Sequence, residues 1–148
     1  MKKRIIIILI ILLLISGAIL YYFLFNKENN VNENNITIED NILNIYFFYG
    51  DGCPHCEKEK EFFKSIEEQY KDKFKIYMFE TWNDKNNVKL LDKVAKVLGD
   101  TITGVPYTVI GSTSIIGYSE SMKDDFIAAI ENEKNNISIY DVIKKNAS

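Results

Sequence analysis

Residues 42–56 read Ile-Leu-Asn-Ile-Tyr-Phe-Phe-Tyr-Gly-Asp-Gly-Cys-Pro-His-Cys, and this stretch decides which fold the chain adopts. Its first eight residues are an almost unbroken apolar run of strand-forming residues, which is the pattern of a strand buried on both faces in the middle of a sheet. Helices must then cover both sides of that sheet. Cys53 and Cys56 follow the strand directly, where the first helix is expected to begin.

The rest of the sequence supplies the helices and strands that such a central strand needs. Amphipathic spacing over 54–70 and 84–98 predicts two helices, and Asp84 and Gly99 suit the N-cap and C′ positions of the second. Five further elements are expected. Three are strands, at 74–79 and, as a hairpin, at 107–110 and 114–116. Two are helical: a long helix starting near Ser121 with a capping-box-like pair of Ser121 and Asp124, and a final turn or two of helix within 138–145.

This order of elements predicts an α/β fold whose central mixed sheet of about four strands is flanked by helices. A strand, a helix and a second strand in succession imply a right-handed parallel crossover, and the later hairpin adds an antiparallel edge to the same sheet. The predicted domain covers residues 42–148. Residues 26–41 before it are polar and rich in asparagine, which predicts a flexible tether.

The N-terminus predicts a transmembrane anchor over residues 1–25. Three basic residues at 2–4 precede an apolar run over 5–25, which as a helix of about 1.5 Å per residue spans the roughly 30 Å hydrocarbon core of a bilayer. A cleaved signal peptide is the alternative, because the small residues at 16–18 resemble a cleavage site. The apolar run continues well past them, so its length favours the anchor, with the basic flank inside and the domain outside.

The charge of the chain limits its partners. Three of the 18 Lys and Arg residues lie in the basic flank, whereas all 21 Asp and Glu residues follow the apolar run, so residues 26–148 carry a formal charge of −6. An acidic domain without a basic patch argues against nucleic acid and against anionic lipid surfaces as partners.

The predicted anchor and its basic flank set the location. They predict a single-pass protein of the cell membrane, with its C-terminal domain on the extracytoplasmic side.

Cys53 and Cys56 are the only cysteines, and both belong to one C-x-x-C motif, which indicates redox or metal chemistry in an exported domain. A cysteine at a helix N-terminus lies near free backbone N–H groups and the positive end of the helix dipole, and both stabilise its thiolate. Pro54 suits the first helical turn, and His55 can add a positive charge or a hydrogen bond to the Cys53 sulfur. Cys53 is then the exposed attacking sulfur and Cys56 the resolving thiol.

Three other uses of the motif are open, and the sequence disfavours each. A structural zinc site takes about four Cys or His ligands, and His55 is the only histidine. A copper carrier is chemically conceivable because thiolates are soft ligands, but nothing else in the sequence supports it. An inert structural disulfide that closes so short a loop removes little chain entropy. We therefore expect redox exchange without a cofactor or a metal.

Two separated motifs make the chain resemble the thioredoxin superfamily over residues 42–134. The first is Cys-Pro-His-Cys at 53–56, and the second is Gly-Val-Pro-Tyr-Thr at 104–108, just before the predicted hairpin. The resemblance implies a cis peptide bond between Val105 and Pro106. It also implies that this loop faces the cysteines and offers the Val105 backbone to a substrate peptide.

The Pro-His pair between the cysteines and Val105 before the proline look like the oxidising, DsbA-type members of the family. Two features depart from that type. Those enzymes carry an inserted helical domain between the second strand and the second helix, where this chain has only residues 80–83. Family members also often bury an acid six residues before the first cysteine, and this chain has Phe47 there. Glu80 is then a candidate for moving protons, and Trp82 is expected either near the site or in packing.

The leading hypothesis is thiol–disulfide exchange with exported proteins that contain thiols or disulfides, with the cysteine pair as the oxidant and an unidentified membrane redox partner recycling it. Two alternatives stay open: a disulfide reductase in the same compartment, and a non-catalytic thioredoxin-like accessory module of a membrane export or maturation complex. The predicted site comprises Cys53 and Cys56 as catalytic residues, Pro54 and His55 as residues that tune the pair, and Val105 and Pro106 as substrate-binding residues.

Overall fold

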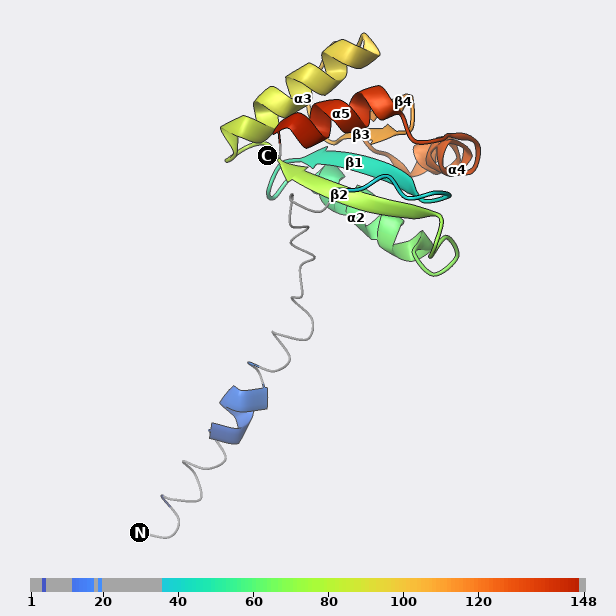
Figure 1. The fold of residues 1–148 in the computed structure, drawn as a ribbon. Coiled ribbons are helices and arrows are strands. Elements are labelled where there is room, and N and C mark those ends of the chain that lie inside the picture. The colour runs from blue at the N-terminus through green and yellow to red at the C-terminus, as the bar shows by residue number, and fades with distance from the viewer. Residues whose placement is uncertain (1–3, 5–11, 18, 20–35, 147–148) are drawn as a thin grey trace. The chain divides into compact units, whose positions relative to one another are not determined.

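The structure is a computed structural model that describes Arg4, residues 12–17, Ile19 and residues 36–146 (Figure 1). The chain divides into two compact units, Met1–Val31 and Asn32–Ser148. In the first unit the described residues are helical. Among the described residues, no helix has both the length and the apolar character needed to cross a bilayer. The predicted anchor over 1–25 lies largely outside the described residues and stays a prediction.

The second unit contains the predicted α/β domain with a four-stranded mixed sheet. The strand order is β2-β1-β3-β4, in which β1 pairs with β2 in parallel, and β3 pairs antiparallel with both β1 and β4. The elements are β1 (Leu43–Tyr49), α2 (Pro54–Ile66), β2 (Phe74–Glu80), α3 (Lys85–Leu98), β3 (Tyr107–Ile110), β4 (Thr113–Ile116), a 3₁₀ turn (Glu120–Met122), α4 (Lys123–Asn132) and α5 (Ile137–Asn146).

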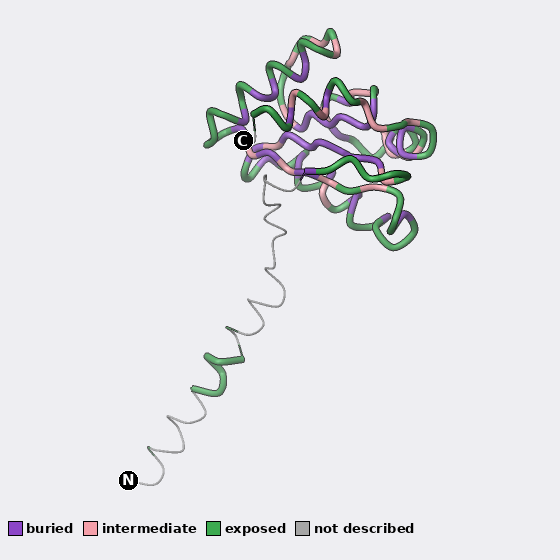
Figure 2. Tube along the Cα trace, in the orientation of Figure 1, coloured by how far each residue is buried: buried purple, intermediate pink, exposed green. Residues whose placement is uncertain are grey.

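Helices cover both faces of the sheet, as the continuous apolar run of β1 predicts. On one face, Phe62 and Phe63 of α2 and Phe126 of α4 form a cluster of edge-to-face and tilted aromatic rings over Leu43 and Ile45. Figure 1 shows α3 and α5 together on the other side. The buried segments run through the middle of the domain (Figure 2). Because both faces are covered, all of β1 except its last residue is buried.

Most predicted boundaries agree with the structure, and the helix around Ser121 is the main exception. Ser121 lies in the 3₁₀ turn, and α4 begins two residues later with no side-chain cap. The Ser121 hydroxyl pairs instead with the Ser119 hydroxyl at 3.0 Å, so the predicted capping box with Asp124 does not form. The first helix also ends at Ile66, although the apolar pattern continues to Tyr70, which is buried from a turn beyond the helix.

The C-terminal segment is more extensive than the predicted turn or two. α5 is a ten-residue helix that packs on α3, with Ile139 and Ile143 fully buried. The described end of the predicted tether also contacts the domain. Ile36 is buried, and its carbonyl accepts a hydrogen bond of 3.4 Å from the Tyr140 hydroxyl of α5. Ile36 therefore packs on the domain, whereas residues 37–41 are exposed.

Candidate functional site

The cysteines lie at the N-terminus of α2, immediately after β1. The connecting turn contains Gly52 with φ 75°, a left-handed conformation that glycine adopts without steric cost. The Cys53 N–H donates to the Gly50 carbonyl at 3.1 Å, which closes the turn. Cys53 is the N-cap of α2 and Pro54 the first helical residue. This arrangement aims the free N–H groups of the first helical turn at the Cys53 sulfur.

Cys53 and Cys56 form a disulfide with a Cα–Cα distance of 5.2 Å, well within the usual range. The Cys53 sulfur also accepts a hydrogen bond of 3.3 Å from the Cys56 backbone N–H. Cys56 is fully buried and packs against Phe47, whereas Cys53 is 4% exposed. Cys53 is thus the more accessible sulfur, although it is far less exposed than the sequence suggested.

The second predicted motif lies beside the first. The Val105–Pro106 bond is cis, as the resemblance implied. The Val105 carbonyl oxygen lies 3.9 Å from the Cys53 sulfur, and the Val105 side chain packs against the cluster of Phe47 and the two cysteines. Two segments about fifty residues apart in the sequence therefore meet at one place, next to the disulfide. Binding of substrate by Val105 and Pro106 stays a prediction.

His55 has a different partner from the one that the sequence suggested. Its Nδ1 lies 3.1 Å from the carbonyl oxygen of Tyr118, so an N–H at that position donates to Tyr118 and not to the Cys53 sulfur. The imidazole is exposed to solvent. His55 thus ties the first turn of α2 to the segment after β4. The N-terminus of α2 is therefore the main group that stabilises a Cys53 thiolate.

Glu59 is the residue that the sequence reasoning missed. It is fully buried on the inner face of α2, three residues after Cys56, and its Oε1 accepts a hydrogen bond from the Thr108 hydroxyl. Its Oε2 has no hydrogen-bond partner among the described residues. Burial raises the pKa of Glu59 to about 8, despite the opposing effect of the Thr108 hydrogen bond. The carboxyl is therefore mostly protonated at neutral pH.

A signal for Glu59 was present in the helical pattern. Glu59 lies three residues before Phe62 and four before Phe63, so it belongs to the apolar stripe of α2 and not to its charged face. The resemblance instead implied a buried acid at the position of Phe47. In the sheet Phe47 pairs with Thr108, the residue that binds Glu59. The buried acid of this chain therefore comes from the helix, and not from the strand position at which the resemblance implied one.

Glu80, the sequence-based candidate for moving protons, has a different role. Its carboxylate accepts hydrogen bonds from the backbone N–H groups of Asp51, Trp82, Asn83 and Asp84 at 2.8 to 3.2 Å. Burial alone would raise its pKa, but these four hydrogen bonds together hold the pKa of Glu80 below its usual range. The group stays ionised near neutral pH, so it fixes the loop instead of exchanging protons.

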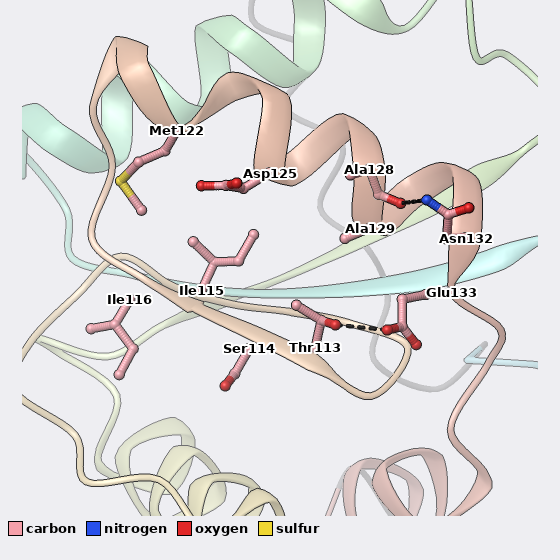
Figure 3. Close-up of a pocket in the computed structure, with 10 residues that line it drawn as sticks. All are labelled: Thr113, Ser114, Ile115, Ile116, Met122, Asp125, Ala128, Ala129, Asn132 and Glu133. Atoms are coloured by element: carbon pink, nitrogen blue, oxygen red, sulfur yellow. Dashed lines mark hydrogen bonds between the residues drawn. The ribbon is translucent and has the colours of Figure 1, made fainter.

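A separate groove of about 580 Å³ lies between β4 and α4 (Figure 3). Figure 3 shows Ile116 and Met122 at one end and the hydrogen bond between Thr113 and Glu133 at the other. Neither cysteine lines it. Within the part of the chain that the structure describes, no three His, Cys, Asp or Glu side chains gather as a metal site.

No protein-family model and no curated protein matches the chain. An uncharacterized thioredoxin-like protein from Clostridium perfringens is similar in structure, with 21% identity, a TM-score of 0.48, and coverage of 72% of this chain and 86% of that one. A glutaredoxin from Archaeoglobus fulgidus is also similar, with 21% identity, a TM-score of 0.41, and coverage of 69% and 98%. By its own strand order, its Cys53–Cys56 disulfide and the cis Pro106 beside it, the chain has a thioredoxin-like fold with a cysteine pair at the start of its first helix.

Proposed function

We propose that this protein exchanges disulfides with exported polypeptides, with Cys53 as the sulfur that forms the mixed disulfide with the substrate and Cys56 as its partner in the chain, which resolves that mixed disulfide in the reverse direction. One observation carries the proposal: the Cys53–Cys56 disulfide lies at a helix N-terminus, and the Val105 carbonyl beside the cis proline is 3.9 Å from the Cys53 sulfur. An inert disulfide needs neither feature. Both suit a sulfur that must be attacked by a peptide thiolate and must leave again as a thiolate.

The exchange proceeds in two balanced steps. A substrate thiolate attacks the Cys53 sulfur, the Cys53–Cys56 bond breaks, and Cys56 leaves as a thiolate, so that a mixed disulfide joins Cys53 to the substrate. A second substrate thiolate then attacks the substrate sulfur of the mixed disulfide, and Cys53 leaves as a thiolate. The substrate loses two electrons and the cysteine pair gains them. Attack is directed to Cys53 because Cys56 is fully buried.

The buried Cys56 thiolate needs a proton, and we assign its exchange to Glu59. Both side chains face inward from α2, one turn apart. Burial raises the pKa of Glu59 to about 8, so the Glu59 carboxyl is mostly protonated at neutral pH. Burial disfavours a charged thiolate in the same interior, so the protonated carboxyl is a suitable proton donor to Cys56. The carboxylate left behind recovers its proton from solvent when the site opens.

We propose that the pair acts as an oxidant. The helix N-terminus and the Cys56 N–H stabilise a Cys53 thiolate in the reduced form. Stabilising the reduced form raises the reduction potential, and each 30 mV corresponds to about 1.4 kcal/mol. The alternative, a reductase, would need a reduced form that is less stabilised relative to the disulfide, and a partner that supplies electrons.

Disulfide transfer from the purified oxidised chain to a reduced peptide with two cysteines tests both exchange and direction. We expect the peptide to be oxidised stoichiometrically, as followed by mass spectrometry. Equilibration with glutathione buffers should give a potential above the roughly −270 mV of thioredoxin. A potential at or below that value would favour a reductase. Absence of any transfer, in either direction, would support a non-catalytic accessory module.

We further propose that the domain works on the extracytoplasmic side of a membrane, held by its N-terminal segment and recycled by a membrane redox partner. The apolar run over 5–25 and the basic residues at 2–4 support this. After mild reduction of intact cells, a membrane-impermeant maleimide should label the protein, and the protein should stay in the membrane fraction after an alkaline wash. Labelling only after cell lysis would contradict the proposed side.

A further inference from the structure

Trp82 is the only tryptophan of the chain, and its side chain is 60% exposed although it lies beside the cysteine loop. It follows β2, whose last residue Glu80 pairs in parallel register with Tyr49, the last residue of β1. The segment with Trp82 and the loop that leads to Cys53 therefore leave the same end of the sheet. A polypeptide that reacts at Cys53 would therefore meet the indole, an aromatic side chain of the kind that is enriched at binding interfaces.

One face of the indole is held against Gly50. A Cβ atom added at Gly50 would overlap Cε2, Cδ2 and Nε1 of Trp82, so the ring covers the Gly50 backbone, and only glycine leaves room for it. The Gly50 carbonyl accepts the hydrogen bond from the Cys53 N–H. The indole is thus packed on the backbone that closes the cysteine turn.

The backbone on both sides of the ring is fixed as well. Oε1 of Glu80 accepts from the Trp82 N–H at 2.8 Å and from the Asp51 N–H at 3.2 Å, so one carboxylate oxygen joins the tryptophan to the cysteine loop. The Thr81 N–H and hydroxyl both donate to the Tyr49 carbonyl at 2.8 Å. The ring is therefore ordered before anything binds, which lowers the entropy cost of binding.

From this arrangement we propose that Trp82 is a substrate-recognition residue, with Glu80 as the residue that positions it. The exposed face of the indole receives an apolar side chain next to the reacting cysteine of the polypeptide, a contact of the kind that dominates binding energy at interfaces. Asp51 of the cysteine loop and Asp84 of the loop with Trp82 are both exposed, so acidic substrate side chains are disfavoured here. The inference rests on the proposed exchange and names its preferred substrate: a polypeptide with an apolar residue beside the cysteine.

Three probes separate recognition from chemistry: a peptide with Leu beside its cysteine, the same peptide with Glu, and dithiothreitol. We measure the second-order rate constant with which each reduces the oxidised full chain. Trp82→Ala should lower the rate for the Leu peptide about tenfold, through weaker apparent binding, and leave the dithiothreitol rate within twofold. Gly50→Ala, which displaces the indole, and Glu80→Gln should act in the same direction. Ile137→Ala, which removes a side chain that is 66% exposed on α5, is the control and should change neither rate.

Equal losses with the Leu peptide and dithiothreitol would overturn the inference, since Trp82 would then act on the cysteines. An unchanged Leu peptide rate would overturn it as well.

Binding is measured without turnover by the fluorescence emission of the single tryptophan, using a Leu peptide with Ser in place of Cys. A blue shift that the Glu peptide does not cause supports recognition, and no shift contradicts it. Failure of the wild-type chain to react even with dithiothreitol would instead contradict the proposed exchange.

Discussion

Glu59→Gln is expected to stabilise the oxidised domain at pH 8 by about 3 to 5 kcal/mol and to leave its stability near pH 4.5 almost unchanged. Burial raises the pKa of Glu59 from 4.5 to about 8 in the folded state. Between these two values the folded state holds a proton that the unfolded state has lost. The free energy of unfolding therefore falls by about 1.4 kcal/mol for each unit of rising pH. Glutamine is neutral throughout and can still accept the hydrogen bond from Thr108.

Urea denaturation of the oxidised full chain at several pH values between 4.5 and 8.5 measures this difference. Glu61→Gln is the matched control, because Glu61 is an exposed glutamate of the same helix, and its stability profile should follow that of the wild type. Parallel profiles for wild type and Glu59→Gln would show that the pKa of Glu59 is not raised. A buried acid that lowers stability at neutral pH is a feature that function, and not packing, explains.

Cys53→Ser is expected to abolish disulfide exchange, whereas Cys56→Ser is expected to react once and stop as a mixed disulfide. The reason is the difference in access: Cys53 is 4% exposed beside Val105, and Cys56 is fully buried under the helix start. Without Cys53 no sulfur is accessible to the substrate. Without Cys56 the mixed disulfide has no resolving thiol in the chain.

Non-reducing gels and mass spectrometry after incubation with a peptide disulfide measure this outcome. Alkylation of the reduced wild-type chain near neutral pH should also label Cys53 first. A double Cys53→Ser, Cys56→Ser variant is the control for background exchange. Preferential labelling of Cys56, or a stable mixed disulfide with Cys53→Ser, would reverse the assignment of the two roles.

The sequence by itself determined the order of the elements and the place of the cysteines, because these depend on local patterns. The apolar run of β1 predicted a strand covered on both faces, and Asp84 and Gly99 predicted the ends of α3 correctly. The apolar run that ends just before the cysteines and Pro54 after Cys53 placed the cysteine pair at the start of a helix. The cis bond before Pro106 was implied by the resemblance and agrees with the structure. The N-terminal anchor depends on length and hydropathy alone and stays a prediction.

Only the tertiary structure decided which polar groups meet. Glu80 and His55 are compatible with a solvated surface when they are read along the chain, and the apolar stripe of α2 gives the side of Glu59 but not its partner. Their roles differ because packing buries Glu59 against Thr108, directs four backbone N–H groups at Glu80, and gives His55 the Tyr118 carbonyl as its partner. A pKa responds to partners that are distant in sequence, and residue spacing on one helix does not identify them.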